Sequence, residues 1–215
     1  MSELMTPIPF RQLMTWITTE YKREGSVFGV HRPFHPSGKT LPIFGETIET
    51  PFGPAAGPNT QLAQNIVAGY FGGARFFELK TVQKMDGAEL AACINRPCIL
   101  AEDECYNCEW STELTVPQAF EEYVKAWCAC KMLAHVYGLG DPDGFVFNMS
   151  VGYDLEGIKG EKVNTYIDGM MDANRTAIFG ECKAVLKELF PAESDYIDGI
   201  SPRVSRSVTV STLHG

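Results

Sequence analysis

The chain has 215 residues, 45% of them hydrophobic, and a formal net charge of −9 at pH 7. That hydrophobic fraction can fill a sizeable core, which excludes a disordered chain. The acidic balance and the lack of any cluster of Lys and Arg in the sequence exclude a typical nucleic-acid-binding protein, so no nucleic acid is expected as a partner.

The sequence also argues against a membrane or exported protein. No apolar run approaches the 18 residues of a transmembrane helix. The first residues, MSELMTPIPFRQ, lack the basic start and apolar block of a signal peptide. We therefore expect a cytoplasmic protein without a membrane partner.

The N-terminal region, residues 1–39, is predicted to be a helix followed by a loop. Apolar residues recur at helical spacing from Phe10 to Lys22, and Gly25 is a typical helix terminator. Residues 27–39 are rich in Pro, Gly and His, which favours a loop. Residues 40–51 then predict a β-hairpin, which in a barrel can plug the N-terminal mouth.

The next stretch predicts a strand–helix–strand unit. Its first strand is a short apolar run broken by small residues, Pro51 to Gly57. Pro58 marks the start of a helix, and Gly72-Gly73 marks its end. A second strand runs from Phe76 to Val82. Two strands joined by one helix in this way are typical of a parallel sheet or barrel.

Two features of this unit suggest a ligand. The first strand ends in Ala55, Ala56 and Gly57, so the backbone is bare enough for a flat group to approach it. Lys80 and Thr81 stand at the C-terminal end of the second strand, the face where α/β barrels keep their active sites. A cation and a hydroxyl beside a bare backbone suit an anionic, planar cofactor such as a flavin. The alternative is a tight helix–strand contact, with Lys80 reaching solvent.

The middle of the chain holds one more short strand, a polar loop and a long helix. The apolar stretch Cys98 to Leu100 is predicted to be a third strand. Residues 101–112 are polar, and Asn107 either offers an amide to a heterocycle or belongs to a solvated loop. Val116 to Tyr137 predicts a helix that Pro117 opens and Gly138 closes.

The C-terminal part continues the alternation of strands and helices. Residues 144–152 are apolar on both faces, as buried parallel strands are. Their two polar members, Asn148 and Ser150, are either ligand groups or buried hydrogen-bonding partners. Two helical segments, residues 157–175 and 176–190, precede a fifth strand at Ser207 to Leu213. This order fits a (β/α) barrel or an open doubly wound sheet, and the sequence has no GxGxxG, P-loop or GxSxG run.

Seven Cys residues are present, and their spacing follows no disulfide framework. In a cytoplasmic chain we expect reduced thiols. Cys105 and Cys108 form a CxxC pair, with Cys93 and Cys98 nearby. Because the second pair that a tetrahedral site needs does not follow, no metal site is predicted. A zinc or iron–sulfur site remains the alternative reading of this cluster.

Several long strings of the sequence resemble one group of flavin enzymes. TPFGPAAGPNT and ARFFELKTV are similar to the flavin domain of dihydroorotate and dihydropyrimidine dehydrogenases. GPAAGPNTQLAQNIV, AEDECYNCEWSTEL, FNMSVGYDLEGI and STLHG resemble the selenate reductase subunit family, whose members are large proteins similar to dihydropyrimidine dehydrogenase. The resemblance spans nearly the whole chain.

The resemblance implies an α/β fold of the dihydroorotate dehydrogenase-like (β/α)8 TIM-barrel type, which binds FMN. A complete barrel takes roughly 250 residues. Residues 40–215 would therefore form an incomplete barrel with about the first five strands. The implied activity is hydride or electron transfer at FMN in a flavin-dependent oxidoreductase subunit. The alternative is a non-catalytic barrel fragment that needs a partner chain for completion.

The resemblance also implies which residues form the FMN site. These are Ala55, Ala56, Gly57, Lys80, Thr81, Asn107, Ser211 and Thr212. Asn107 would in addition contact a small-molecule substrate, with Glu109 beside it. A fixed cation such as Lys80 would stabilise the negative charge of reduced flavin.

Other parts of such an enzyme are expected outside these 215 residues. The relatives implied by the resemblance continue past STLHG into a Cys-Pro segment, whose Cys is the general acid/base. They continue into portions that hold FAD, NAD(P)H and iron–sulfur clusters. The expected catalytic Cys therefore lies beyond Gly215, and we expect a fragment whose possible partners are other oxidoreductase subunits.

Overall fold

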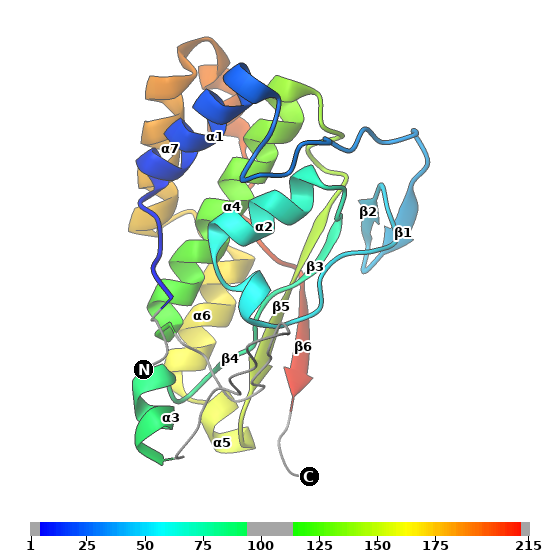
Figure 1. Cartoon of the computed structure of the whole chain (residues 1–215). Coiled ribbons are helices and arrows are strands. Elements are labelled where there is room, and N and C mark those ends of the chain that lie inside the picture. Colours follow the sequence, from blue (N-terminus) through cyan, green and yellow to red (C-terminus); the bar gives the residue numbers. More distant parts are fainter. Residues whose placement is uncertain (1–4, 94–113, 212–215) are drawn as a thin grey trace.

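The computed structural model describes residues 5–93 and 114–211. In this part of the chain a parallel sheet carries helices along one side, and a two-stranded hairpin lies on the other side (Figure 1). The helices are α1 (Phe10–Glu24), α2 (Ala63–Phe71), α3 (Gly87–Cys93), α4 (Val116–Tyr137), α5 (Leu155–Ile158), α6 (Glu161–Met171), α7 (Ala177–Leu189) and α8 (Ser194–Gly199), with 3-10 turns η1 (Pro58–Thr60) and η2 (Pro191–Glu193). The strands are β1 (Leu41–Ile43), β2 (Glu46–Ile48), β3 (Phe76–Glu78), β4 (Val82–Gln83), β5 (Val146–Gly152) and β6 (Ser207–Ser211).

The parallel sheet is centred on β5. One edge of β5 pairs with β3 and β4, and the other edge pairs with β6, so that Val151 faces both Val82 and Val210. Residues 52–54 extend the sheet beyond β3, because the carbonyl oxygen of Phe52 accepts from the amide of Phe76 and that of Pro54 accepts from the amide of Glu78. The described strands therefore occupy four neighbouring positions, half the number in a closed (β/α)8 barrel.

The predicted position of β5 in the sheet needs one correction. Cys98 to Leu100, predicted as a third strand, lies outside the described residues. Because β5 pairs directly with β3 and β4, it takes the third position in the sheet rather than the fourth. The described sheet does not close on itself, as expected for an incomplete barrel, and the strand–helix–strand alternation is confirmed.

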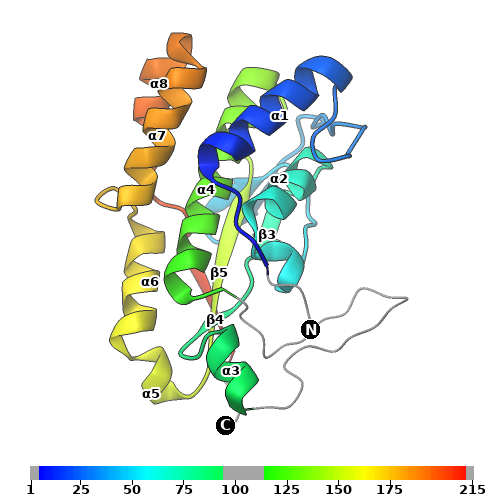
Figure 2. The same cartoon turned by 60° about the vertical axis from the view of Figure 1, so that its left-hand side comes forward.

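The long helices form where local signals predict them. Gly25 ends α1 in the left-handed conformation, with a φ of 67°. Thr115 and Gln118 form a reciprocal capping box at the start of α4, and Gly138 ends that helix with a φ of 63°. The buried face of α4 packs on the sheet, where Trp127 makes an edge-on contact with Phe147 of β5. Figure 2 shows α1, α4 and α6 to α8 gathered on this side.

The hairpin of β1 and β2 lies against the N-terminal end of the sheet, as predicted. Phe44 and Gly45 form its turn, both with positive φ, which is the requirement of a two-residue I′ turn. The ring centroid of Phe44 is 6.1 Å from that of Phe76, the first residue of β3. A salt bridge from Arg206 to Glu46 joins the hairpin to the residue before β6.

Some helix boundaries differ from the predictions. The segment predicted as one helix from residue 157 to 175 forms two helices, α5 and α6, because Gly160 has extended backbone dihedrals between them. The short helix α3 was not predicted. None of the described helices combines the length and the apolar composition that crossing a bilayer requires.

Candidate functional site

The strand that carries Lys80 is interrupted by a bulge. From Glu78 to Val82 the chain advances four residues, whereas β5 advances three over the paired stretch from Asn148 to Val151. One extra residue is therefore accommodated between β3 and β4, which is the definition of a β-bulge. The predicted continuous strand is corrected here, since Lys80 lies inside this interruption and β4 continues beyond it.

Backbone hydrogen bonds hold Lys80 on both sides of the bulge. Its amide donates to the carbonyl oxygen of Thr60 over 3.3 Å. Its own carbonyl oxygen accepts from the hydroxyl of Tyr123 on α4 over 2.7 Å. The residue is 3% exposed, so the alternative in which Lys80 extends into solvent is wrong.

The turn poor in side chains lies next to the bulge. The amide of Gly57 donates to the hydroxyl of Thr60, the same residue whose carbonyl oxygen contacts the Lys80 amide. Gly57 is buried, Ala56 is half-buried and Ala55 is exposed. The structure thus brings the backbone of Lys80 beside the end of this turn, while Ala55 faces solvent.

A second part of the site forms around Gly152, the last residue of β5. Thr81 Oγ1 lies 2.8 Å from Ser150 Oγ. A methyl group added to Gly152 would lie 2.9 Å from Thr81 Cγ2 and 3.2 Å from the carbonyl oxygen of Ser211. Two of the predicted site residues, Thr81 and Ser211, therefore flank the same glycine, from segments far apart in the sequence.

Toward the C-terminal ends of the strands, the side of the sheet that faces away from the helices is polar. Asn148 Nδ2 donates to Thr209 Oγ1 over 2.7 Å, which links β5 to β6. Ser150 in turn pairs with Thr81. Asn148 and Ser150 therefore each have a hydrogen-bonding partner within the protein, which is one of their two predicted roles. In a barrel this face is the interior, where ligands contact the strand ends.

Several predicted residues lie outside the described part of the chain. These are Asn107, Glu109 and Thr212, and the same holds for Cys98, Cys105 and Cys108. Their predicted roles stay predictions. Within the residues that the structure describes, no three His, Cys, Asp or Glu side chains gather closely enough to hold a metal ion. The three described thiols on α4 and α7 are free and buried: Cys128, Cys130 and Cys182.

Sequence reasoning missed the part that Tyr123 plays at the bulge. The helical pattern places this residue on the apolar face of α4, and its ring is fully buried. Burial raises the pKa of the Tyr123 hydroxyl well above its ordinary value, so the group stays protonated and donates to Lys80. No local signal reveals this contact, because the two residues are 43 positions apart.

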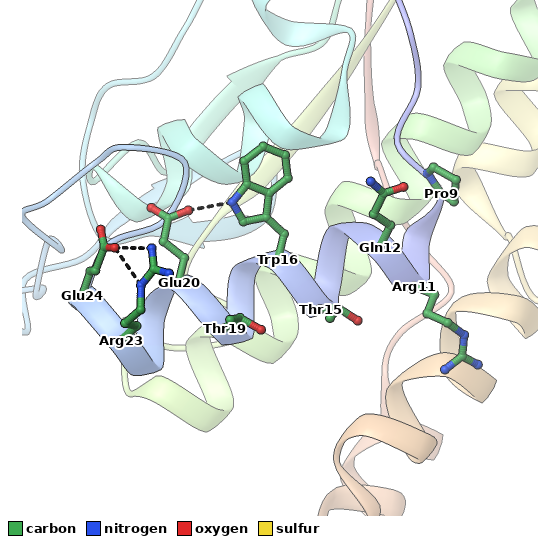
Figure 3. A pocket seen from close by; sticks show the side chains of 9 residues that line it. All are labelled: Pro9, Arg11, Gln12, Thr15, Trp16, Thr19, Glu20, Arg23 and Glu24. Atoms are coloured by element: carbon green, nitrogen blue, oxygen red, sulfur yellow. Dashed lines mark hydrogen bonds and ion pairs between the residues drawn. The ribbon is translucent and has the colours of Figure 1, made fainter.

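Two surface grooves are lined by residues other than Leu79, Lys80 and Thr81 of the bulge. Figure 3 shows one of about 740 Å³ along the outer side of α1, where Trp16 Nε1 donates to Glu20. Glu20 also accepts from the hydroxyl of Ser26 and the amides of Phe28 and Gly29, so it closes the turn after α1. We read this groove as structural.

A second groove, of about 920 Å³, lies at the C-terminal ends of β4 and β5. Lys84, just after β4, and residues of α5 and of the start of α6 line it. Its two sides are joined where Lys162 Nζ donates to the carbonyl oxygen of Lys84 over 2.9 Å. The positive φ of 115° at Tyr153, directly after β5, marks a strained backbone beside it.

Comparisons with known proteins agree on one family. A family model described as the N-terminal TIM-barrel domain of the oxidoreductase YgfK matches residues 28–215. The YgfK proteins of Escherichia coli strain K12 and of Escherichia coli O157:H7, both named as oxidoreductases, are each 44% identical to the chain over 234 aligned residues. These alignments cover all of this chain but 22% of each relative, so the chain spans about a fifth of their length. No solved structure matches the chain.

Proposed function

Since this chain belongs to the family of N-terminal TIM-barrel domains of YgfK oxidoreductases, we propose that it supplies one wall of an FMN site in a flavin-dependent oxidoreductase. The proposal rests on one observation above all. A buried lysine sits in a strand bulge beside a turn poor in side chains, toward the ends of parallel strands where barrel enzymes bind ligands.

The chemistry of the described residues fits a flavin. Lys80 offers a cation, Thr81 and Ser211 offer hydroxyl groups, and Gly57 leaves a stretch of backbone without a side chain beside Lys80. Bound FMN would supply reversible hydride or electron transfer, which no side chain provides. The protein's part would be to hold a positive charge close to a cofactor that gains negative charge on reduction. We assign that part to Lys80.

The proposal is tested by titrating FMN into the purified chain and following the quenching of flavin fluorescence. We expect saturable binding that Lys80→Met weakens by about tenfold or more, because a charge-assisted contact is lost. Lys131→Met is the matched control, since Lys131 is also buried (4% exposed) but donates to the carbonyl oxygen of Pro142 and to Asp143, close to the N-terminal end of β5. Equal binding by all three chains, or none by the unaltered chain, would overturn the proposal.

The narrower parts of the assignment belong to the same proposal. We propose that Asn107 contacts both flavin and substrate, with Glu109 beside it, and that Ala55, Ala56 and Thr212 belong to the FMN site. We further propose that the longer protein is a dihydropyrimidine dehydrogenase-like selenate reductase subunit, because GPAAGPNTQLAQNIV and FNMSVGYDLEGI resemble that family. FAD, NAD(P)H and iron–sulfur clusters would belong to the longer protein. Replacing Asn107 by Ala should weaken FMN binding, which the same titration measures.

A second candidate role is that of a barrel part completed by a partner chain, and β6 carries the observation that favours it. Val208 and Val210 pair in register with Met149 and Val151, so they face the helix side of the sheet. The two β5 residues are at most 1% exposed, whereas Val208 is 44% and Val210 is 53% exposed. Such an edge strand invites pairing with another chain.

This second role predicts association of the isolated chain. Sedimentation equilibrium should show dimers or larger species, and replacing Val208 and Val210 by Lys should shift the chain to a monomer by adding charge to the uncovered face. A monomeric unaltered chain with one cooperative unfolding transition would contradict it. The FMN titration is a separate measurement, so the two roles are distinguished.

A further inference from the structure

We propose that Tyr123 is the positioning residue for Lys80, acting from α4 through the backbone of the bulge. The inference rests on the proposed function, because Lys80 is there the cation of the FMN site. Tyr123 lies on α4, on the helix side of the sheet, and its hydroxyl donates to the Lys80 carbonyl oxygen. Its role would be to fix the position of the Lys80 backbone, from which the lysine side chain extends.

A bulge creates the need for such a residue. The extra residue in a bulged strand interrupts the regular ladder, so its backbone groups lose their usual partners. At Lys80 both groups find partners outside β5, the amide at Thr60 and the carbonyl oxygen at Tyr123. The amide of Leu79 still bonds to the carbonyl oxygen of Asn148 at 3.0 Å, so the regular ladder gives way directly after it.

Tyr123 is suited to hold this carbonyl group. Its ring is fully buried and makes an edge-on contact with Tyr166 of α6, with ring centroids 6.3 Å apart. The hydroxyl is 2.7 Å from the Lys80 oxygen, a normal distance for a strong O–H···O bond. The contact joins helix α4 to the bulge, where the strand departs from regular geometry. A displacement of that helix would therefore move the lysine.

The neighbouring tyrosine provides a matched control. Tyr166 is 2% exposed, and its hydroxyl has no hydrogen-bond partner in the described part of the chain. Tyr123→Phe and Tyr166→Phe each remove one buried hydroxyl from the same aromatic pair. Only the first removes a contact with the bulge. Differences between the two variants therefore report on the bulge and not on the packing of the core.

The first test is a double-mutant cycle of FMN binding with Tyr123→Phe and Lys80→Met. We expect Tyr123→Phe to weaken FMN binding by about fivefold to tenfold, and Tyr166→Phe to change it by less than about twofold. In the Lys80→Met background Tyr123→Phe should have little further effect, because a positioning residue has nothing left to position. The same loss in both backgrounds would overturn the proposal, as would equal losses from the two tyrosine variants.

A second test needs no flavin. Amide hydrogen exchange of the unliganded chain should become at least about tenfold faster at Lys80 and Thr81 in Tyr123→Phe, and stay within about twofold in Tyr166→Phe. Unchanged exchange at Lys80 would overturn the inference even if the chain binds FMN. If the unaltered chain takes up no FMN, the proposed function fails. Faster exchange confined to residues 79–82 would then still support Tyr123 as the residue that holds Lys80 in place.

Discussion

Arg75 and Glu49 form a buried ion pair, with Arg75 Nε 2.9 Å from Glu49 Oε2. The guanidinium also donates to the carbonyl oxygens of Tyr70 and Leu139, at 2.8 and 2.6 Å. Glu49 Oε1 accepts from the amide of Asp141 over 2.7 Å. The pair therefore joins the end of the hairpin, the end of α2 and the turn before β5. These segments meet at the N-terminal ends of the strands, opposite the candidate site.

Replacing Arg75 by Met should lower the free energy of unfolding by about 3–5 kcal/mol, because it leaves the Glu49 carboxylate buried without its counter-charge. Denaturation by urea, followed by circular dichroism, measures the change. Arg11→Met is the control, since Arg11 pairs with Glu188 on the surface. Exposed pairs contribute about 0–1 kcal/mol. Similar losses from both variants would show that the buried pair of Arg75 and Glu49 contributes no more to stability than an exposed pair.

The close packing of Gly53 against β3 gives a prediction about residues 52–54, which extend the sheet beyond β3. A methyl group added there would lie 1.5 Å from the carbonyl oxygen of Phe76, which no side-chain movement can relieve. Gly53→Ala should therefore separate residues 52–54 from β3 and lower the unfolding midpoint by several degrees or more. Gly180→Ala is the control, because its added methyl group meets nothing within 4 Å and lies inside α7. That change should stabilise the chain by roughly 0.5–1 kcal/mol. A Gly53→Ala chain as stable as the parent would refute the close approach.

Helix ends could be predicted from the sequence because their causes are local. Gly25 and Gly138 adopt the left-handed conformation that a helix terminator needs, and Pro117 stands in the first turn of α4. The sequence holds a similar local signal for α3. Asp86 accepts from the amide of Glu89, and the Glu89 carboxylate accepts from the amide of Asp86, which is a capping box readable as D-x-x-E.

The bulge and the order of the strands could not be predicted in the same way. Both depend on register, which two strands far apart in sequence set together. The stretch Leu79-Lys80-Thr81 alone does not show that the part of β5 paired with it is one residue shorter. The sequence pattern predicts Lys80 and Thr81 as candidates, because they stand at the C-terminal end of the second predicted strand. Their partners, Tyr123 and Ser150, are 43 and 69 positions away.

The pair formed by Thr81 and Ser150 provides a further prediction. Thr81→Val keeps the shape of the side chain and removes its hydroxyl, so the 2.8 Å contact with Ser150 is lost. We expect a loss of about 0.5–1.5 kcal/mol in the free energy of unfolding. Ser150→Ala in the Thr81→Val background should cost less than it does alone, because the two hydroxyls share one hydrogen bond. Fully additive losses in urea denaturation would show that the two groups do not interact.

The hydrogen bonds that Glu20 accepts give a prediction about how low pH affects the stability of the turn after α1. Although burial acts in the opposite direction, hydrogen bonds from Gly29, Ser26, Phe28 and Trp16 lower the pKa of this carboxyl below its ordinary value of 4.5. A lowered pKa in the folded state stabilises the fold above the unfolded value, and the contribution is lost as the pH falls through the folded pKa. The effect should be small, because the group is near solvent.

The measurement is the difference in unfolding free energy between the parent chain and Glu20→Gln from pH 7 to pH 3. We expect a constant difference at pH 6 to 7 that shrinks as the pH falls below about 4.5, because the parent carboxylate is then protonated. Glu24→Gln serves as the control on the same helix, since Glu24 pairs with the adjacent Arg23 on the surface and so closes no turn. A difference for Glu20→Gln that persists unchanged at pH 3 would mean that the charge of Glu20 does not hold the turn, and that its hydrogen bonds act equally well from a neutral group.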